Sequence, residues 1–341
     1  MRRIAVLGAG SWGTALAISL AESGHAVGLW VRRPEVAARM RRERHNPTYL
    51  PEASIPGSVA ITSDLLDVVE GRDMWVFAIP SQSIRGVAQG AQAAADEDLL
   101  IVSVAKGIEN GTLLTTTQVL AEVLTRVPAR QIAALSGPSH AEEVALNMPT
   151  TLVAAAPDEE VAQEVQSVFM TPSLRVYVNL DVIGVEIGGS VKNVLAIAAG
   201  ICDGLGYGDN AKAALLTRGM AEIQRLGLVM GAEAATFAGL TGIGDLVVTC
   251  MSRHSRNRYL GEQIGRGARL PEIQAGMSMV AEGVSTTRSV HELARRHHIE
   301  MPITEAVYSI LFEGKDPQEA VFELMTRSAK REDWLPHVLQ I

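Results

Sequence analysis

The start of the chain contains the pattern that most restricts its fold. Gly8, Gly10 and Gly13 follow an apolar run at residues 4–7 and lead into a helical pattern at residues 14–20. In such a strand–turn–helix the first glycine allows a tight turn, the second lets the backbone approach a pyrophosphate, and the third lets helix and strand pack closely. The free N–H groups at the helix start then face the phosphates. The pattern therefore predicts a dinucleotide-binding site in a Rossmann-type fold.

The residues after the second apolar run indicate which dinucleotide binds. The apolar run at residues 26–31 is followed by Arg32 and Arg33, and no acidic residue follows until Glu35. An NAD site has an acidic residue about 20 residues beyond the glycines to bind the ribose, whereas a guanidinium binds a 2′-phosphate through two hydrogen bonds. We therefore predict NADP(H) as cofactor. Use of NAD(H) stays open, and so does the alternative that both arginines are solvated loop residues.

Composition limits the class of protein. With 341 residues, 47% hydrophobic and 20% charged, the chain is typical of a folded enzyme with about two domains. The net charge of −8 argues against nucleic acid as a partner. We expect a cytoplasmic protein with no membrane insertion and no targeting segment. Cys202 and Cys250 lie far apart without other residues at metal-ligand spacing, so we expect buried thiols and no metal.

Apolar runs alternate with helical patterns in the first half of the chain. The runs at residues 74–79, 99–104, 132–135 and 151–154 are typical of parallel strands buried on both faces, and residues 175–178 complete the series. Helical patterns separate the runs, for example at residues 113–124 and 159–169. This alternation predicts an α/β domain with a Rossmann-type, doubly wound and mostly parallel sheet.

Only helical patterns follow Asp181. The clearest lie at residues 186–201, 210–230, 282–296 and 316–325. We therefore predict a dinucleotide-binding domain at residues 1–183 and an all-helical substrate-binding domain at residues 184–341. A homodimer formed through the helical domain is the assembly that we favour.

Ligands bind at the carboxyl ends of parallel strands in such sheets, and three polar segments follow predicted strands. Residues 106–109 begin with Lys106, and residues 136–142 are expected to open a helix whose N–H groups hold an anion. Residues 46–51 are expected in a long loop after the second strand. Each segment is also compatible with an ordinary cap or turn, but all three are expected at one edge of the sheet.

The helical half contains a lysine in unusual surroundings. Lys192 lies in an apolar helical run, and its neighbours on the same helical face are Gly188, Gly189 and Ala196. Since these residues are too small to cover it, we expect a ligand-sized gap above the backbone. Burial lowers the pKa of a lysine, which suits a general acid or base. The alternative is a side chain that reaches the surface.

Two later segments, expected to be loops, complete the candidate site. Residues 239–246 are rich in glycine and contain one acid, Asp245. Residues 252–258 concentrate cationic and amide donors, including Arg256 and Asn257, as a phosphate dianion requires. A basic surface turn is the alternative.

The chain resembles the bacterial NAD(P)-dependent glycerol-3-phosphate dehydrogenase family in a set of motifs: GAGSWGTALA, NPTYLP, KGIE, SGPSHAEEV, GGSVKNVLAIAAGICDGLGYGDNAKAAL, GLTGIGDL, SRN and VAEGVSTT. The resemblance extends from residue 4 to about residue 325. It implies the family's reaction, the reversible reduction of dihydroxyacetone phosphate to sn-glycerol 3-phosphate, which supplies phospholipid synthesis.

The same resemblance implies a role for individual residues. Lys192 matches the catalytic proton acceptor. Cofactor positions are matched by Ser11, Trp12, Arg32, Arg33, Tyr49, Lys106, Ala141, Arg256, Val280 and Glu282. Substrate positions are matched by Lys106, Gly137, Ser139, Lys192, Asp245, Ser255, Arg256 and Asn257.

The residues support a mechanism for this reaction but leave two other functions open. Lys192 would protonate the developing alkoxide, Lys106 would stabilise its charge, and Arg256 with Asn257 would anchor the phosphate of a small triose substrate. One alternative is a β-hydroxyacid dehydrogenase that uses the basic turn to bind a carboxylate. The other is a redox sensor that binds a dinucleotide without turnover.

Overall fold

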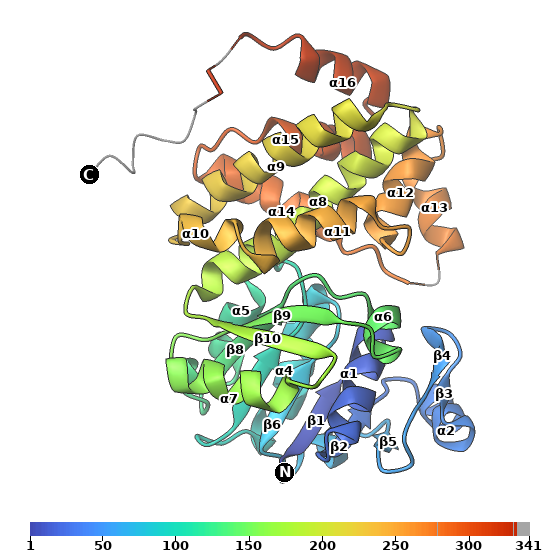
Figure 1. Ribbon diagram of the computed structural model, residues 1–341, viewed down its shortest axis with the longest axis vertical. Helices are drawn as coiled ribbons and strands as arrows, with labels where there is room; N and C mark the ends of the chain where they lie inside the picture. The colour runs from blue at the N-terminus through green and yellow to red at the C-terminus, as the bar shows by residue number, and fades with distance from the viewer. Residues whose placement is uncertain (278, 330, 333–341) are drawn as a thin grey trace. The chain divides into compact units, whose positions relative to one another are not determined.

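The computed structural model describes residues 1–277, 279–329 and 331–332. Contacts between Cα atoms divide the chain into two units (Figure 1). The first unit comprises Met1–Lys106 and Leu114–Glu186, and the second comprises Gly107–Leu113 and Ile187–Ile341. The predicted domain boundary between residues 183 and 184 stays a prediction, and the end of the predicted helical domain, residues 333–341, lies outside the described residues.

The first unit is built on an eight-stranded sheet with the order β10-β9-β8-β7-β6-β1-β2-β5. Its strands are β1 (Arg3–Leu7), β2 (Ala26–Trp30), β5 (Ala60–Thr62), β6 (Met74–Phe77), β7 (Leu100–Ser103), β8 (Ile132–Ser136), β9 (Thr150–Ala155) and β10 (Leu174–Asn179). The six neighbouring strands β8-β7-β6-β1-β2-β5 all pair in parallel. The prediction of a mostly parallel sheet is therefore confirmed.

The expectation that residues 151–154 continue the parallel series is wrong. Strand β9 is antiparallel to β8, and β10 is parallel to β9. The reason is the connection between β8 and β9, whose helix α6 (Ala141–Ala145) has five residues. Such a helix is about 7.5 Å long, whereas returning along a five-residue strand requires roughly 17 Å. The chain therefore re-enters the sheet from the edge at which it left.

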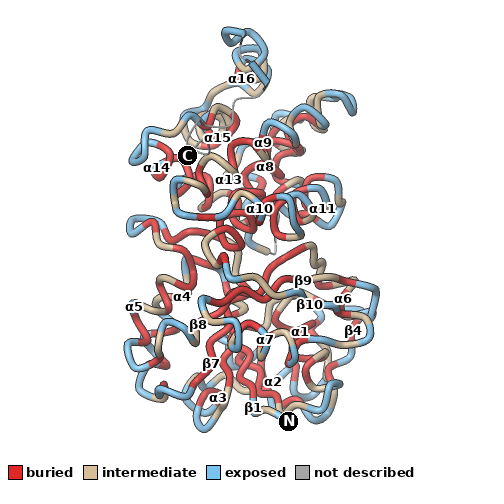
Figure 2. Tube along the Cα trace, turned by 60° about the vertical axis from the view of Figure 1, so that its left-hand side comes forward, coloured by how far each residue is buried: buried red, intermediate tan, exposed pale blue. Residues whose placement is uncertain are grey.

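Helices cover both faces of the sheet. They are α1 (Ser11–Glu22), α2 (Pro34–Glu43), α3 (Leu65–Val69), α4 (Ile84–Ala91), α5 (Thr116–Val123) and α7 (Glu159–Phe169). Alternate residues of β1 enter different cores, because successive side chains of a strand point to opposite faces. Ile4 and Val6 belong to one apolar cluster, and Ala5 and Leu7 belong to the other. Figure 2 shows the strands of the sheet as largely buried, as the prediction of a doubly wound sheet requires.

Residues 46–51 do not lie in a long loop after the second strand. Helix α2 follows β2, and the segment then forms a hairpin from β3 (His45–Asn46) and β4 (Leu50–Ser54). The side chain of Asn46 is buried and its Nδ2 donates to the Ala9 carbonyl and to Thr14 Oγ1, each at 2.9 Å. This amide fixes the hairpin against the glycine turn.

The second unit has no strand among its described residues. Its helices are α8 (Val182–Gly204), which begins in the first unit, α9 (Asp209–Val229), α10 (Ala234–Phe237), α11 (Asp245–Met251), α12 (Arg256–Gly265), α13 (Leu270–Gly276), α14 (Gly283–Arg296), α15 (Pro302–Tyr308) and α16 (Pro317–Met325). Two π-helical turns, η4 (Leu240–Gly244) and η5 (Ser309–Glu313), join some of them. The prediction of an α/β fold followed by helices is confirmed.

Among the residues that the structure describes, two helical stretches are long and apolar enough to cross a membrane by length and composition alone. The first is α8, whose apolar window is 89% buried within the protein. The second, Ala234–Met251, consists of α10, η4 and α11 and is 44% buried. The burial of α8 explains its apolar composition, because a helix that is apolar on all sides is typical of a protein core.

Helices α8 and α12 pack with their backbones in contact. Gly200 and Gly204 of α8 lie against the segment of α12 that contains Gly261 and Gly265. A Cβ atom on Gly200 would lie 1.9 Å from the carbonyl oxygen of Arg258. Small residues four positions apart let helices approach this closely. The contact fixes two helices that each carry predicted site residues.

Candidate active site

The glycine turn has the geometry that a pyrophosphate requires. Gly8 has a φ of +119°, and a Cβ atom there would lie 2.5 Å from the Ala78 carbonyl oxygen. A Cβ atom on Gly13 would lie 1.9 Å from the Gly8 carbonyl oxygen, so the third glycine lets α1 pack on the turn. Open space surrounds the position of a Cβ on Gly10. Gly10 is also the N-cap of α1 and offers no side chain to the first N–H groups. These features fit a bound dinucleotide.

The two predicted cofactor arginines follow β2, the strand beside β1. Both Arg32 and Arg33 are exposed. Arg33 lies 4.0 Å from Glu35, which is a loose ion pair. Strands β1 and β2 are parallel, so their carboxyl ends lie at the same edge of the sheet. The glycine turn after β1 and the arginines after β2 therefore both lie at this edge. The role of the arginines in binding a 2′-phosphate stays a prediction.

Three predicted site residues of the first unit meet at one carbonyl group. Lys106 Nζ donates to the Gly137 carbonyl at 2.9 Å, and Ser139 Oγ donates to it at 3.0 Å. Gly137 has a φ of +135°, which an L side chain rarely adopts. The segments after β7 and β8 are therefore brought together, as the sequence predicted.

The neighbouring predicted cofactor residues lie in less regular surroundings. Ala141 is buried at the start of α6, and Tyr49 is half-buried in the β3–β4 turn, where its N–H donates to Asn46 Oδ1 at 3.3 Å. The expectation that α6 holds an anion gains no support, because α6 is one short turn whose first residues include Glu142 and Glu143. The anchoring role of Asn46 was missed, because its partners lie 32 and 37 positions away.

Lys192 lies in the second unit and is buried rather than extended to the surface. Its Nζ lies 2.5 Å from Asp245 Oδ1 and donates to Thr249 Oγ1 at 2.6 Å. The Lys192 and Asp245 side chains are 6% and 1% exposed. The carboxylate thus compensates a buried ammonium, which is costly to leave unpaired. Sequence reasoning named Asp245 but missed Thr249, which follows it by one helical turn.

The expected gap above Gly188 is not present. A Cβ atom on Gly188 would lie 2.6 Å from the Thr241 carbonyl oxygen, so the backbone of η4 occupies that space. The segment expected to be a loop at residues 239–246 instead forms η4 and the start of α11. The glycine therefore permits close packing, and this packing places Asp245 beside Lys192.

The expected basic loop at residues 252–258 is a short turn followed by α12. Ser255 is the N-cap of α12, and its Oγ accepts the N–H of Arg258 at 3.2 Å. Arg256 is exposed at the first position of the helix, and one of its N–H groups donates to the Val280 carbonyl at 2.9 Å. Since a guanidinium carries five N–H donors, Arg256 retains capacity for an anion.

Asn257 connects α12 to two other segments of the second unit. Its Nδ2 donates to Asn193 Oδ1 on α8, and its Oδ1 accepts the N–H of Gly283, both at 2.9 Å. Gly283 begins α14 and follows its N-cap, Glu282. The first turn of α12 therefore holds the segment with Val280 and Glu282 and also contacts the residue after Lys192.

Both cysteine thiols are buried, and burial disfavours the charged thiolate form. Cys202 and Cys250 are free and buried, as predicted. Burial raises the pKa of the Cys250 thiol to about 12. Because the thiolate is the reactive form, this thiol is inert at neutral pH.

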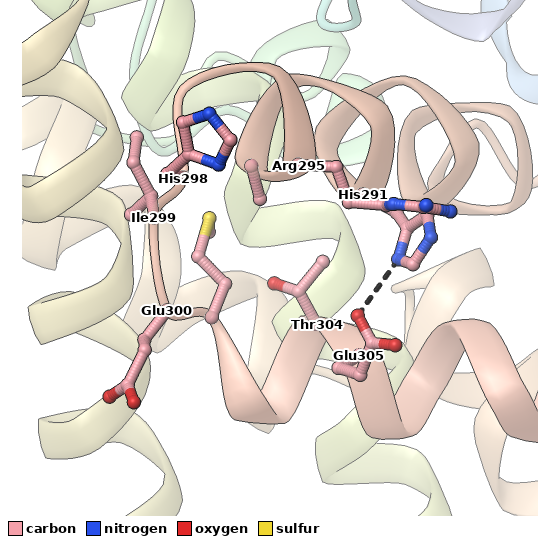
Figure 3. Close-up of a pocket in the computed structure, with 9 residues that line it drawn as sticks. His291, Arg295, His298, Ile299, Glu300, Thr304 and Glu305 are labelled. Carbon is pink, nitrogen blue, oxygen red and sulfur yellow. Dashed lines mark ion pairs between the residues drawn. The ribbon is translucent and has the colours of Figure 1, made fainter.

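A cavity of about 420 Å³ lies in the second unit, and Figure 3 shows the residues that line it. None of the predicted site residues lines it; its walls come from α14, α15 and the link between them. Within it His291 Nδ1 lies 3.0 Å from Glu305 Oε2 in a poorly aligned contact. The His291 ring also stacks on Tyr308 with centroids 3.7 Å apart. These contacts show how α14 packs on α15 and do not extend the candidate site.

Comparisons with known proteins agree with this geometry. The family model described as NAD-dependent glycerol-3-phosphate dehydrogenase N-terminus matches residues 3–162, and the model of the C-terminus matches residues 181–322. The chain is 63% identical over 340 residues to glycerol-3-phosphate dehydrogenase [NAD(P)+] 1 of Salinibacter ruber, covering 100% of each chain. It is 54% identical to a relative of the same name from Chlorobium limicola, covering 96% of this chain and 99% of the relative.

A solved structure shows the same relationship in three dimensions. The crystal structure of glycerol-3-phosphate dehydrogenase from Coxiella burnetii superimposes with a TM-score of 0.92 at 42% identity, covering 96% of this chain and 99% of that one. Full-length similarity at this level reaches both units of the chain. The protein is therefore an NAD(P)-dependent oxidoreductase and belongs to the glycerol-3-phosphate dehydrogenase family.

Proposed function

We propose that Lys192 is the proton donor and acceptor in the interconversion of dihydroxyacetone phosphate and sn-glycerol 3-phosphate. The observation that carries this proposal is the buried Lys192 ammonium, held by Asp245 and Thr249. When bound, NADP(H) supplies or accepts the hydride at C2 of the substrate. As the C2 carbonyl is reduced, its bonding electron pair moves to oxygen, and Lys192 delivers the proton that this oxygen takes up. Oxidation reverses both transfers.

We assign the remaining predicted residues to binding. Lys106 would stabilise the developing alkoxide electrostatically, and its contact with the Gly137 carbonyl supports a shared role with Ser139 in holding the substrate. Gly8, Gly10 and Gly13 would hold the pyrophosphate of the cofactor. The rest of the cofactor site is assigned to Ser11, Trp12, Arg32, Arg33, Tyr49, Ala141, Val280 and Glu282.

We assign the substrate phosphate to the first turn of α12. Ser255, Arg256 and Asn257 all lie at this helix start, where N–H groups and a guanidinium favour an anion. Binding the phosphate away from the reacting carbon orients the carbonyl for reaction. Arg256 also donates to the Val280 carbonyl, which supports its second assignment, to the cofactor.

Two variants test these roles against each other in an assay that follows NADPH absorbance after addition of dihydroxyacetone phosphate. Lys192→Ala should lower kcat by about 10²–10⁴-fold and leave the Kd of NADPH unchanged. Arg256→Ala should raise the KM of the triose by roughly 10-fold or more, since it removes a charged hydrogen-bond donor. Lys315→Ala, which alters a half-buried lysine paired with Glu323, is the control.

Each role has an outcome that contradicts it. Substantial turnover by Lys192→Ala would exclude its proton transfer, and an unchanged KM in Arg256→Ala would place the phosphate elsewhere. We also propose that the protein is cytoplasmic and forms a homodimer. Light scattering on the purified protein tests the dimer.

A further inference from the structure

A cluster of four partly buried charged side chains joins α8, α9 and α12. Arg258 NH1 and Lys212 Nζ each lie 2.5 Å from an oxygen of Asp203, and Arg258 NH2 lies 3.3 Å from Glu262. Each of these side chains is between 15% and 18% exposed. The charges are therefore partly removed from solvent, where attraction between them is stronger than at the surface.

Arg258 also holds the backbone that precedes α12. Its Nε donates to the Ser252 carbonyl at 3.1 Å, and its main-chain N–H donates to Ser255 Oγ at 3.2 Å. The Ser252 carbonyl in addition accepts the N–H of Ser255 at 3.2 Å. Arg258 thus fastens both ends of the turn that delivers Arg256 and Asn257.

The same residue ties this turn to the helix of Lys192. Asp203 lies on α8, and the Arg258 carbonyl is the atom that a Cβ on Gly200 of α8 would strike. Only a planar fork with several donors reaches the Ser252 carbonyl, Asp203 and Glu262 from one side chain, whereas lysine presents a single point charge. A lysine at this position would therefore keep the charge but lose part of the bracing.

We propose that Arg258 is a positioning residue for recognition of the substrate phosphate. It holds Arg256 and Asn257 in place relative to Lys192 while its own guanidinium bonds to protein groups. The inference rests on the proposed function, in which the first turn of α12 binds the phosphate. Small displacements of binding groups weaken a ligand steeply.

The test compares Arg258→Lys with a matched control on the same helix. Arg266 pairs with the other oxygen of Glu262 but is 59% exposed and lies at the far end of α12, so Arg266→Ala should match the unaltered protein. In Arg258→Lys we expect the KM of dihydroxyacetone phosphate and the Ki of inorganic phosphate to rise together by about tenfold. We expect kcat to change by less than about threefold.

A substrate without phosphate separates positioning from general damage. Dihydroxyacetone cannot use the phosphate site, so its kcat/KM should be the same in Arg258→Lys and in the unaltered protein. Asp203→Asn, which removes the charge that Arg258 contacts without changing size, should shift phosphate affinity in the same direction. It provides a second variant if Arg258→Lys fails to fold.

Two results would overturn the inference. One is an unchanged Ki of inorganic phosphate in both variants, and the other is an equal loss with dihydroxyacetone, which indicates a merely structural role. Arg256→Ala distinguishes this failure from failure of the proposed function. If Arg256→Ala raises KM and Arg258→Lys does not, only the positioning role is wrong; if neither does, the phosphate site itself is misplaced.

Discussion

The buried pair of Lys192 and Asp245 should separate the stability of this protein from its activity. Lys192→Met removes the ammonium and leaves the Asp245 carboxylate buried, and Asp245→Leu does the reverse. With side chains 6% and 1% exposed and 2.5 Å between the charged atoms, solvent cannot replace the lost partner. Breaking such a pair costs about 3–5 kcal/mol of unfolding free energy. We expect each single variant to lose stability in that range.

The double variant should recover most of this loss. Replacing both members of a buried pair by apolar residues of similar volume is often neutral, so Lys192→Met with Asp245→Leu should lie within about 1–2 kcal/mol of the unaltered protein. The coupling free energy between the two positions would then offset most of the sum of the stability losses in the two single variants. All three variants should nevertheless lack turnover, because each lacks the proton donor or its partner.

Urea unfolding followed by far-ultraviolet circular dichroism, together with the NADPH assay, measures both properties. The reasoning is refuted if the double variant loses as much stability as the two single variants combined. It is also refuted if either single variant loses less than about 1 kcal/mol, because the pair would then behave like one exposed to solvent.

Three further predictions follow from other parts of the molecule. Arg32→Asp should weaken NADPH relative to NADH in steady-state kinetics, and an unchanged preference would show that this arginine is only surface charge. Gly200→Ala should destabilise by roughly 1–3 kcal/mol through its clash with the Arg258 carbonyl. Gly86→Ala in α4, where a Cβ meets open space, should stabilise by about 0.5–1 kcal/mol in the same urea assay. If both alanine variants changed the free energy of unfolding in the same direction, the packing argument would be wrong. Burial raises the pKa of Glu222 to about 7, so the folded state binds this proton more tightly, and its contribution to stability should fall as pH rises from about 4.5 to about 7. The stability of the unaltered protein relative to Glu222→Gln should therefore fall by roughly 2–3 kcal/mol between pH 5 and pH 8, and a stability difference between the two proteins that does not vary with pH would refute the shift.

Helices with local signals matched their predictions closely. Helix α7 covers the predicted residues 159–169, and α16 begins after Asp316, whose Oδ1 accepts the N–H groups of Gln318 and Glu319. Helix α5 begins at Thr116, three residues later than predicted, because Leu113 has a φ of +62°. Cap and turn signals involve residues within one helical turn, so the chain carries them locally.

Features that depend on distant partners could not be predicted in the same way. The apolar run of β9 is compatible with either strand direction, and the short α6 connection decided for antiparallel. Gly188 suggested a gap beside Lys192, but the backbone of η4 fills this space, and Thr241 of η4 lies 53 positions further along the chain. The amide of Asn257 was predicted to anchor the substrate phosphate, and in the structure its Nδ2 donates to Asn193 and its Oδ1 accepts the N–H of Gly283.

The sequence by itself determined the glycine turn, the alternation of strands and helices, and the residue types that a phosphorylated carbonyl substrate needs. These depend on periodicity and spacing over a few residues, where backbone geometry leaves few choices. The tertiary structure alone decided which carboxylate compensates Lys192, which side chain braces the turn before α12 and how closely α8 meets α12. Those outcomes arise from burial, where a charge needs a partner and a helix needs a matching surface, and the partner lies far along the chain.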